Sequence, residues 1–389
     1  MVPNGSEDPV GPIEEIIEEI KEAGGDAYRL CYQCGKCDVV CPWNHVRDFS
    51  IRKIIREATF GVTEIESEDI WRCTTCGNCP DKCPRGVEQI ALGLSLRRLA
   101  SNYEVIHASA KPAKAARGSL IGEGNPLNEK RAERADWTEG LNVKPFTEET
   151  EYLFFGCCYL SYDARLKNVA RATAAILNKA GVDFGILGTK ESCCGESIRK
   201  TGAEDTYKKL ARENIKTFVD SGVKKIVVSS PHCLEAFKNE YAEFMVNFEV
   251  FHMTEFLAKL IKDGTLTLTG NYEKKVAYHD PCYLGRHNEV FDEPREVLQS
   301  VPGLTLLEMA ASRKNSLCCG GGGGRVWMET PKGERFSDLR VEQARAIGAD
   351  VLATACPYCI TMFEDSRLTM DLEDTIEIKD ITEIIHEVI

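Results

Sequence analysis

Eighteen cysteines are the strongest constraint in this sequence of 389 residues. A chain of this length can bury ordinary hydrophobic cores, so it does not need a disulfide scaffold to fold. Its first residues (MVPNGSEDPVGP) lack the charged-then-apolar pattern of an export signal, so we expect a cytoplasmic protein with reduced thiols. The cysteines are therefore expected to be metal ligands or redox groups.

Eight of the cysteines form two runs with the same spacing, C-x2-C-x2-C-x3-C-P. This is the spacing of bacterial two-cluster ferredoxins, in which three close thiolates hold one cubane and the fourth reaches the other cluster. A pair of zinc sites is the alternative, but zinc sites rarely have this third cysteine and the trailing Cys-Pro. We assign one [4Fe–4S] cluster to Cys31, Cys34, Cys37 and Cys83, and the other to Cys73, Cys76, Cys79 and Cys41. Clusters fully ligated by cysteine have no open position and pass single electrons.

Three amphipathic segments surround these runs. Isoleucines recur at helical spacing over residues 13–23, and similar patterns cover residues 46–59 and 86–99. The sequence therefore predicts an all-helical domain over residues 1–107, with both runs at helix ends. Residues 108–150 lack such a pattern and are rich in Ala, Lys, Gly, Pro, Asn and Glu, so we expect a long linker there.

The rest of the chain alternates short apolar runs with helical segments, which is typical of α/β structure. Helices are expected over residues 164–180, 206–221 and 336–347. The expected strands are Tyr152–Phe155, Phe184–Leu187, Lys225–Val228, Lys275–Tyr278, Leu304–Leu307 and Val351–Ala353. The predicted fold class is an α+β multidomain protein, in which a duplicated α/β domain follows the helical domain.

The α/β part is an internal repeat. The Cys-Cys-Gly sequence at 318–320 matches the one at 193–195, an offset of 125, and Cys359 matches Cys233 at an offset of 126. The Cys-Tyr-Leu sequence at 282–284 matches 158–160 at an offset of 124. Three anchors in register are more than chance would produce, so we expect a first repeat over residues 151–272 and a second over residues 273–389.

The second repeat contains five cysteines from three expected loops, namely Cys282, Cys318, Cys319, Cys356 and Cys359. A cubane or a zinc ion needs only four thiolates, so a fifth indicates a less regular cluster or a free redox thiol. Five glycines follow Cys319, and they would let the backbone pass close to a bulky inorganic group. A nucleotide phosphate loop is the alternative, but the strand-GxGxxG-helix context and a Lys-Ser/Thr pair are both missing.

The first repeat departs from this pattern at one position, because Ser230 stands where the second repeat has Cys356. An extra cysteine beside Cys158 restores a set of five: Cys157, Cys158, Cys193, Cys194 and Cys233. We expect a second cluster of altered ligation there. A vestigial or zinc site is the alternative, since four thiolates would satisfy zinc. His232, beside Cys233, is either structural or a replacement ligand.

The formal net charge of -13 and the pI of about 5.2 argue against nucleic acid as a partner, because phosphate binding depends on clustered Lys and Arg. The small basic patches at Arg97-Arg98 and at residues 111–117 are interpreted as solvated faces or partner contacts. No segment has the roughly 18 apolar residues of a membrane span, so we expect no direct membrane insertion.

Two cysteine runs followed by two Cys-Cys-Gly repeats resemble the D-type subunit of heterodisulfide reductase and its relatives, the fused C-plus-B arrangement. Gly124-Asn125-Pro126, Arg134 and Trp137 are also similar to that family, and the resemblance covers nearly the whole chain. It implies two cubanes that pass electrons to one or two non-cubane [4Fe–4S] clusters of the repeats, which split a disulfide in single-electron steps. It also implies a multi-subunit complex with flavin-containing or other redox subunits.

Two hypotheses about function remain. In the first, a thiol or disulfide substrate reacts at Cys318 and Cys319, and His279, Asp280 or His287 supplies a proton; otherwise His279 and Asp280 cap a strand end. In the second, the chain is a non-catalytic electron relay in a larger flavin-containing complex, of the electron-bifurcating or class II benzoyl-CoA reductase type. The chain has no flavin or nicotinamide fingerprint, so its electrons are expected to come from another protein. Ser230 favours the relay, because cleavage between two clusters needs both to be competent.

Overall fold

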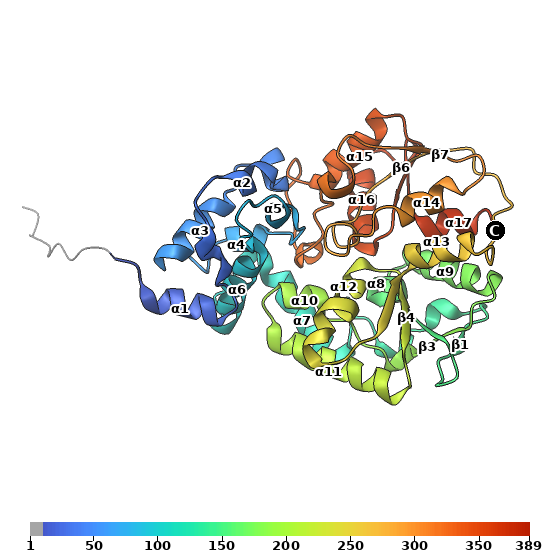
Figure 1. Ribbon diagram of the computed structural model, residues 1–389, viewed down its shortest axis with the longest axis horizontal. Coiled ribbons are helices and arrows are strands. Elements are labelled where there is room, and N and C mark those ends of the chain that lie inside the picture. Colours follow the sequence, from blue (N-terminus) through green and yellow to red (C-terminus); the bar gives the residue numbers. More distant parts are fainter. Residues whose placement is uncertain (1–10) are drawn as a thin grey trace, which may run out of the picture.

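The computed structural model describes residues 11–389, in which a helical N-terminal lobe lies beside two α/β units (Figure 1). Within the lobe, α1 packs against α3 and α6, and Ile20, Ile55 and Leu96 are fully buried in its core. The helices of the lobe are α1 (Glu14–Glu22), α2 (Lys36–Val40), α3 (Ile51–Phe60), α4 (Asp69–Arg72), α5 (Asn78–Asp81) and α6 (Gln89–Asn102). The all-helical prediction for this lobe is confirmed.

A glycine precedes the corresponding helix in each cysteine run. Gly35 immediately precedes α2 and Gly77 immediately precedes α5, with φ angles of 78° and 80°. Glycine adopts this left-handed conformation without the steric cost that a side chain would add. The chain therefore turns sharply between the second and third cysteine of each run, and α2 packs against α5.

The segment expected to be an irregular linker contains helix α7 (Lys111–Glu123), so the expectation is wrong for those residues. Ala113, Ala116 and Leu120 are buried along one face of α7, and Gly124 ends it in the left-handed conformation. The sequence pattern does not predict this helix, because its buried face is made mostly of alanine, which gives little apolar contrast. Strand β1 (Lys144–Pro145) then joins the first sheet, beside β3.

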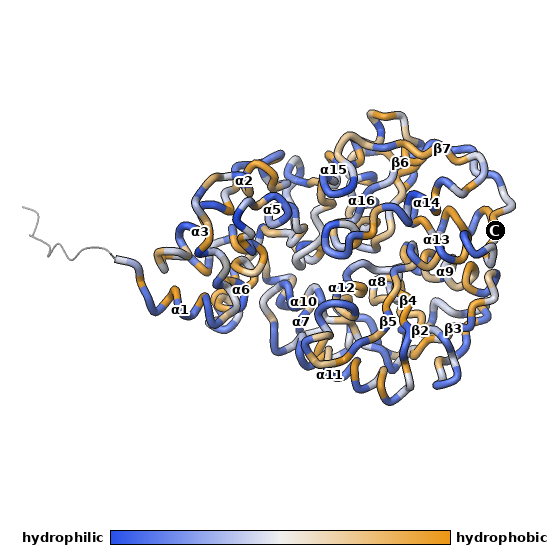
Figure 2. Tube along the Cα trace, viewed as in Figure 1, coloured by the Kyte–Doolittle hydropathy of each residue, from blue (hydrophilic) through white to orange (hydrophobic). Residues whose placement is uncertain are grey.

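The first repeat is built around a parallel sheet of order β1-β3-β2-β4-β5. Its strands are β2 (Tyr152–Phe155), β3 (Phe184–Ile186), β4 (Lys225–Val228) and β5 (Glu249–His252). Its helices are α8 (Cys157–Tyr162), α9 (Lys167–Lys179), α10 (Glu196–Lys200), α11 (Glu204–Asp220), α12 (Pro231–Glu235) and α13 (Met253–Lys262). The strands β2 and β4 are mostly orange in Figure 2, because helices cover the sheet.

The second repeat has a parallel sheet of order β7-β6-β8-β9, which reproduces β3-β2-β4-β5 of the first. Its strands are β6 (Lys275–Tyr278), β7 (Thr305–Leu307), β8 (Val351–Thr354) and β9 (Glu377–Asp380). Its helices are α14 (Glu293–Gln299), α15 (Phe336–Ala346), α16 (Pro357–Thr369) and α17 (Ile381–His386). The predicted duplication and the α/β class are confirmed.

Strands β1, β5 and β9 were not predicted. The strands β5 and β9 lie at sheet edges, contain charged residues and run directly into α13 and α17, so their short patterns merge with those of the helices.

The two repeats share one hydrophobic core, in which α9 packs against α17 and α13 against α14. Arg165 joins them further by ion pairs with Glu364 and Glu383 of the second repeat. Because all strands within each sheet are parallel, the loops that follow β2, β3 and β4, or β6, β7 and β8, meet at one edge. The repeat cysteines lie in these loops or in the first turn of the helix that follows.

Candidate iron–sulfur sites

The first cysteine run lies at the surface of the lobe. Cys34 is exposed, Cys31 and Cys83 are partly buried, and Cys37 is buried. Tyr32 contacts Cys34 and lies within electrostatic range of Cys83, so the fourth cysteine of the second run approaches the first run. The structure thus brings Cys83 toward the group to which the sequence analysis assigned it.

The second run lies deeper, with Cys76 and Cys79 buried and Cys73 partly buried. Burial raises the pKa of the Cys41 thiol, and the neighbouring Cys76 and Cys73 raise it further. Burial likewise raises the pKa of Cys79, with Cys73, Cys76 and Cys41 adding to the rise. The fourth cysteine of the first run therefore meets the second run, as the crossed assignment requires.

The five cysteines of the second repeat form one buried group. The thiol of Cys359 donates to the Sγ of Cys319 at 3.2 Å, and Cys282 lies close to Cys318. The neighbouring Cys318 and Cys359 hold the pKa of Cys319 well below its usual value. Burial raises the pKa of Cys356, but hydrogen bonds with Cys359 and His232 lower it to about 5. Low-pKa thiols of this kind are ready to bind metal as thiolates.

The first repeat also gathers its five cysteines. The Sγ atoms of Cys233 and Cys194 are 3.6 Å apart, and Cys158 lies close to Cys193, as Cys157 does to Cys233. Hydrogen bonds from Cys193 and Cys233 lower the pKa of Cys194 to about 6. Cys157 has a φ of 61°, a strained conformation for a residue with a side chain.

Arg134, which the sequence analysis noted only as part of the family resemblance, reaches the first-repeat site. Its Nη1 donates to the Sγ of Cys158 at 3.6 Å, while its Nε pairs with the buried Glu191 at 3.1 Å. The guanidinium places a positive charge beside a set of thiols, which favours their thiolate forms.

Backbone N–H groups point at cysteine sulfurs in the lobe and in both repeats. The donors are Gln33, Thr75, Val87, Gly195 and Gly320, at N···S distances of 3.3 to 3.5 Å. Hydrogen bonds of this kind stabilise the negative charge of sulfur ligands and tune cluster potentials. The all-sulfur donor sets and these N–H groups fit iron–sulfur clusters.

The buried run and the second-repeat site are in contact. The thiol of Cys318 donates to the hydroxyl of Thr74 at 3.7 Å. The nearby Cys318, together with burial, raises the pKa of Cys76 well above its usual value. Cys76 and Cys318 are both buried.

The glycine run after Cys319 makes this contact sterically feasible. A Cβ on Gly322 would lie 2.4 Å from the Thr74 carbonyl oxygen, and one on Gly323 would lie 2.5 Å from that of Cys73. These two glycines therefore approach the backbone of the second cysteine run, whereas the sequence predicted an approach to an inorganic group.

The structure gives different surroundings to the three candidate proton donors. Burial lowers the pKa of His279 well below its usual value, and the positive charge of Arg340 lowers it further. The Nδ1 of His279 accepts a hydrogen bond from Arg340 at 3.1 Å, and its Nε2 lies 3.5 Å from the Cys359 sulfur. Asp280 pairs with Arg295 through both carboxylate oxygens, at 2.7 and 3.0 Å. His287 stacks on Tyr283, and its Nε2 lies 2.9 Å from the Thr75 carbonyl oxygen, so it helps to hold the lobe against the second repeat.

His232 faces the second repeat, although it neighbours Cys233 in sequence. Its Nδ1 lies 2.7 Å from Glu196, and its ring packs against Tyr283 and Tyr358 at centroid distances of 4.2 and 4.5 Å. Burial lowers its pKa, but Glu196 and Cys356 raise it to about 10. The contact of this histidine with Cys356 exists only when the two repeats pack together, so the sequence indicated a role for it only within the first repeat.

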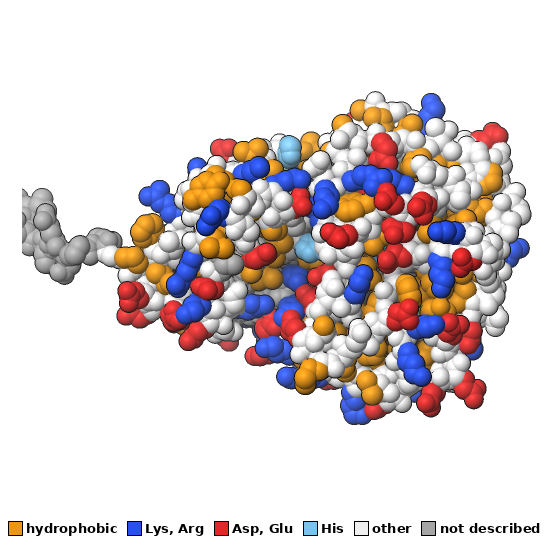
Figure 3. Space-filling model, viewed as in Figure 1, with side chains coloured by type: hydrophobic (Ala, Val, Ile, Leu, Met, Phe, Trp, Pro, Cys, Tyr) orange, Lys and Arg blue, Asp and Glu red, His pale blue; other side chains and the backbone are white. Residues whose placement is uncertain are grey.

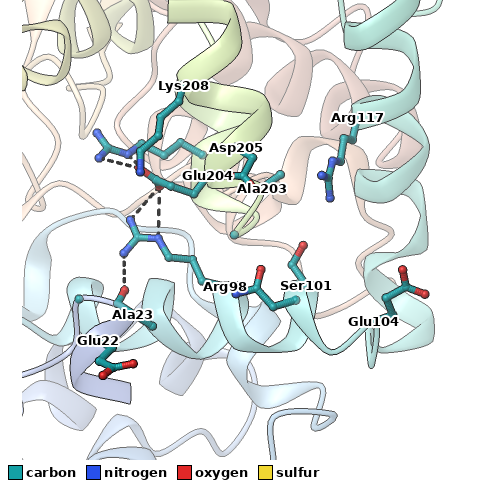
Figure 4. Close-up of a pocket in the computed structure, with 14 residues that line it drawn as sticks. Glu22, Ala23, Arg98, Ser101, Glu104, Arg117, Ala203, Glu204, Asp205 and Lys208 are labelled. Carbon is teal, nitrogen blue, oxygen red and sulfur yellow. Dashed lines mark hydrogen bonds and ion pairs between the residues drawn. The ribbon is translucent and has the colours of Figure 1, made fainter. Parts of the chain in front are cut away.

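A charged hollow of about 520 Å³ separates the lobe from α11 and is distinct from the thiol sites (Figure 4). Arg98 crosses it, pairing with Glu204 at 3.1 Å and donating to the Ala23 carbonyl at 2.7 Å. Arg199 and Lys208 approach the same carboxylate. These cations converge on Glu204, so ion pairs around the hollow connect the lobe to the first repeat.

The cysteines form four groups, and backbone N–H groups point at sulfurs in the lobe and in both repeats. The buried run also contacts the group of the second repeat. This arrangement defines an iron–sulfur protein that transfers electrons. Residues 27–87 match the family described as 4Fe-4S dicluster domain, and residues 152–238 and 276–364 each match the family described as Cysteine-rich domain.

The chain is 32% identical to the D-type subunit of the dihydromethanophenazine:CoB–CoM heterodisulfide reductase of Methanosarcina mazei, over 92% of this chain and 93% of that protein. It therefore belongs to the family of iron–sulfur proteins that includes the D-type subunits of heterodisulfide reductases.

Two other similar proteins are longer. One is the probable iron-sulfur-binding oxidoreductase FadF of Bacillus subtilis, at 41% identity over 82% of this chain and 46% of that protein. The other is the EtfAB:quinone oxidoreductase of Syntrophomonas wolfei, at 37% identity with the same coverage. The chain spans about half the length of these two relatives. Among residues 11–389, none of the helices has the length and apolar character needed to cross a bilayer.

Proposed function

We propose that the chain relays single electrons between the two cubanes of its N-terminal lobe and a non-cubane cluster of the second repeat, within a larger redox complex. The contact of Cys318 with the buried run carries the proposal, because its thiol donates to the Thr74 hydroxyl at 3.7 Å and Cys76 lies close to it. Cys31, Cys34, Cys37 and Cys83 would hold the outer cubane, and Cys73, Cys76, Cys79 and Cys41 the inner one.

The residues around this contact keep its two sides at a fixed separation. The Thr75 and Tyr283 hydroxyls are 2.7 Å apart, and Arg286 donates to the Cys76 carbonyl at 2.6 Å. Thr75, Cys76, Cys318 and Tyr283 are all buried, so electrons would cross a dry and rigid boundary. Such a boundary favours transfer because little solvent has to reorient.

The space between the two repeat sites is occupied by side chains. The Tyr159 and Tyr358 rings are 4.8 Å apart, the Ser197 and Tyr358 hydroxyls are 3.1 Å apart, and His232 bridges from Glu196 toward Cys356. These side chains fill the space that a disulfide held between two clusters would have to occupy. Their presence favours a relay over disulfide cleavage.

The names of the relatives indicate the kind of partner. One is a subunit of a heterodisulfide reductase and another is an EtfAB:quinone oxidoreductase. We infer that this chain likewise exchanges electrons with a separate redox subunit, which we take to contain flavin, and that it works in the reducing cytoplasm.

The test compares two matched double substitutions in the anaerobically purified full chain. Cys318→Ser/Cys319→Ser changes the second-repeat pair, and Cys193→Ser/Cys194→Ser changes its counterpart in the first repeat. After rapid mixing with a one-electron reductant, freeze-quenched EPR follows the spectra of both the cubanes and the repeats. We expect the first variant to stop electrons at the lobe, whereas the second leaves transfer into the second repeat intact.

The same samples distinguish relay from thiol chemistry. Iron and sulfide analysis reports how many clusters are bound, with about sixteen irons expected for four clusters and about twelve for three. An EPR signal of the oxidised protein that changes on addition of a thiol would establish substrate chemistry at the repeats. Equal loss of transfer into the second repeat in both variants would contradict the proposed route.

A further inference from the structure

The outward end of the lobe has the features of a docking surface. Cys34 is the exposed member of the eighteen cysteines, all of which lie in the described part of the chain. The buried run faces the second repeat through Arg286 and His287, so the first run is the end of the relay that a partner can approach. In Figure 1, α3 lies on the outer side of the lobe, while α5 lies toward the repeats.

Large apolar side chains are exposed in and beside the first cysteine run and at the end of α3. Val39 is 80% exposed and Tyr32 is 60% exposed, and Leu30 and Phe60 are also exposed. A hollow of about 550 Å³ adjoins Phe60 and is also lined by Cys31, Gln33 and Arg56. Exposed apolar groups gathered around a hollow mark interaction sites.

Cations accompany these apolar side chains. Lys36, Arg56 and Arg85 are exposed, and no ion pair involves them within residues 11–389. Arg52 lies beside Gly35, and Arg85 acts electrostatically on Tyr32. Figure 3 shows blue and orange side chains together over α2 and α3, whereas the red side chains gather lower down, over α1. In a chain of net charge -13, this surface is locally cationic.

We propose that this surface, defined by Leu30, Tyr32, Cys34, Lys36, Val39, Arg56, Phe60 and Arg85, docks an acidic one-electron redox protein. The unpaired cations attract its acidic face, and the apolar side chains exclude water from the contact at Cys34. Each encounter would move one electron between the partner's redox group and the cluster that the first cysteine run would hold, so that one is oxidised and the other reduced and no bond forms or breaks. This inference rests on the proposed relay. It adds that the partner at the outer end of the relay is an acidic protein.

The experiment uses an acidic [2Fe–2S] ferredoxin as the probe and measures its second-order rate constant for reduction of the full-length holoprotein. The test variant is Lys36→Glu/Arg56→Glu/Arg85→Glu. The control is Lys179→Glu/Lys190→Glu/Lys224→Glu, which makes the same charge change at exposed, unpaired lysines of the first repeat. At low salt we expect the test variant to be slower by about tenfold or more, and the control by less than about twofold.

Salt and a probe of opposite charge sharpen this result. The difference between test and control should shrink at high ionic strength, where the Debye length falls to a few ångströms. A basic c-type cytochrome, used as the acceptor from reduced protein, should react faster with the test variant than with the wild type. The apolar part is examined with Val39→Ser, which should slow the ferredoxin reaction at high salt as well.

Dithionite serves as a small reductant that needs no docking surface. Normal dithionite reduction of the lobe, together with equal ferredoxin rates in the test and control variants, would overturn the docking inference alone. Normal ferredoxin reduction of the lobe without onward transfer into the second repeat would overturn the relay and leave the docking surface standing. A test variant that reacts more slowly with both the acidic and the basic probe would also contradict docking by charge.

Discussion

At the scale of single residues, His279 was a candidate proton donor for catalysis, but its surroundings make it a hydrogen-bond donor to a cysteine sulfur. Arginine has no acceptor atom, so the contact between Arg340 and Nδ1 leaves the proton of the neutral imidazole on Nε2. That N–H then points at the sulfur of Cys359. A neutral donor beside a ligand sulfur stabilises the more negative, reduced state of the site.

We predict that His279→Ala lowers the midpoint potential of the second-repeat cluster, because the reduced state loses one hydrogen bond. The expected shift is several tens of millivolts, on a scale where about 59 mV is a tenfold change in a one-electron equilibrium. A redox titration followed by EPR measures it, and His287→Ala serves as the control because it contacts a backbone carbonyl instead of a sulfur. An unchanged potential in His279→Ala would show that this hydrogen bond is not made to the loaded site.

The crossed ligand sets give a second prediction at this scale. Cys83→Ser should damage the cluster of Cys31, Cys34 and Cys37, because Cys83 approaches the first run near Tyr32. Iron content should fall by up to about four per chain, with loss of the spectrum of the outer cubane. Cys41→Ser is the reciprocal variant and should damage the inner cubane. If Cys83→Ser instead removed the inner spectrum, the crossed assignment would be wrong.

At the scale of elements, the glycine run joins two loops that are about 250 residues apart in sequence. Gly322 and Gly323 allow the backbone that follows Cys319 to touch the backbone of Cys73 and Thr74. The same contact brings Cys318 to Cys76. The loop therefore sets the distance between the inner cubane site and the second repeat.

We predict that Gly322→Ala weakens this junction, because the new Cβ would lie 2.4 Å from the Thr74 carbonyl oxygen. The cost should be about 1–3 kcal/mol, the usual range for overpacking, and transfer from lobe to repeat should slow. Gly118→Ala is the control, since nothing lies within 4 Å of its Cβ on helix α7, and it should be neutral or stabilising. Urea unfolding and stopped-flow reduction measure the two effects. Unfolding curves and transfer rates that match wild type would contradict the close approach.

At the scale of the whole molecule, Arg97 ties the lobe to both repeats. Its guanidinium donates to the carbonyl oxygens of Ile70 and Cys73 in the lobe, Lys200 in the first repeat and Gly323 in the second. It is fully buried, and burial lowers its pKa. The interpretation of Arg97-Arg98 as a solvated face or partner contact is therefore wrong for both residues, since Arg98 is held by Glu204 and the Ala23 carbonyl.

We predict that Arg97→Met destabilises the assembled molecule by about 2–4 kcal/mol, because several buried carbonyls lose a charged donor. Limited proteolysis should then cut between the lobe and the repeats, and electron transfer past the lobe should slow. Arg98→Met is the matched neighbour, which lines the charged hollow and should cost less than about 1 kcal/mol. Equal protease resistance of both variants would show that Arg97 does not hold the parts together.

The sequence by itself determined the local chemistry and the fold class. Metal-ligand spacing is short-range, so the two cysteine runs could be recognised from the residues alone, and their ferredoxin-type spacing predicted the crossed pairing. The repeat offsets likewise predicted two equivalent α/β units, and parallel strands bring their loop cysteines to one edge. Helix α7 was missed because alanine gives little apolar contrast, and strands β5 and β9 because their patterns merge with the next helix.

Only the tertiary structure decided which groups meet across the three parts. Cys76 and Cys318, His232 and Cys356, and Arg97 with its carbonyls are far apart in the chain, and no periodicity relates them. Their contacts depend on how one finished unit packs against another, which is set by the summed shape and burial of many side chains. The sequence therefore predicted the candidate iron–sulfur ligands, whereas the packing of the lobe on the repeats decided which of these thiols approach one another across the parts.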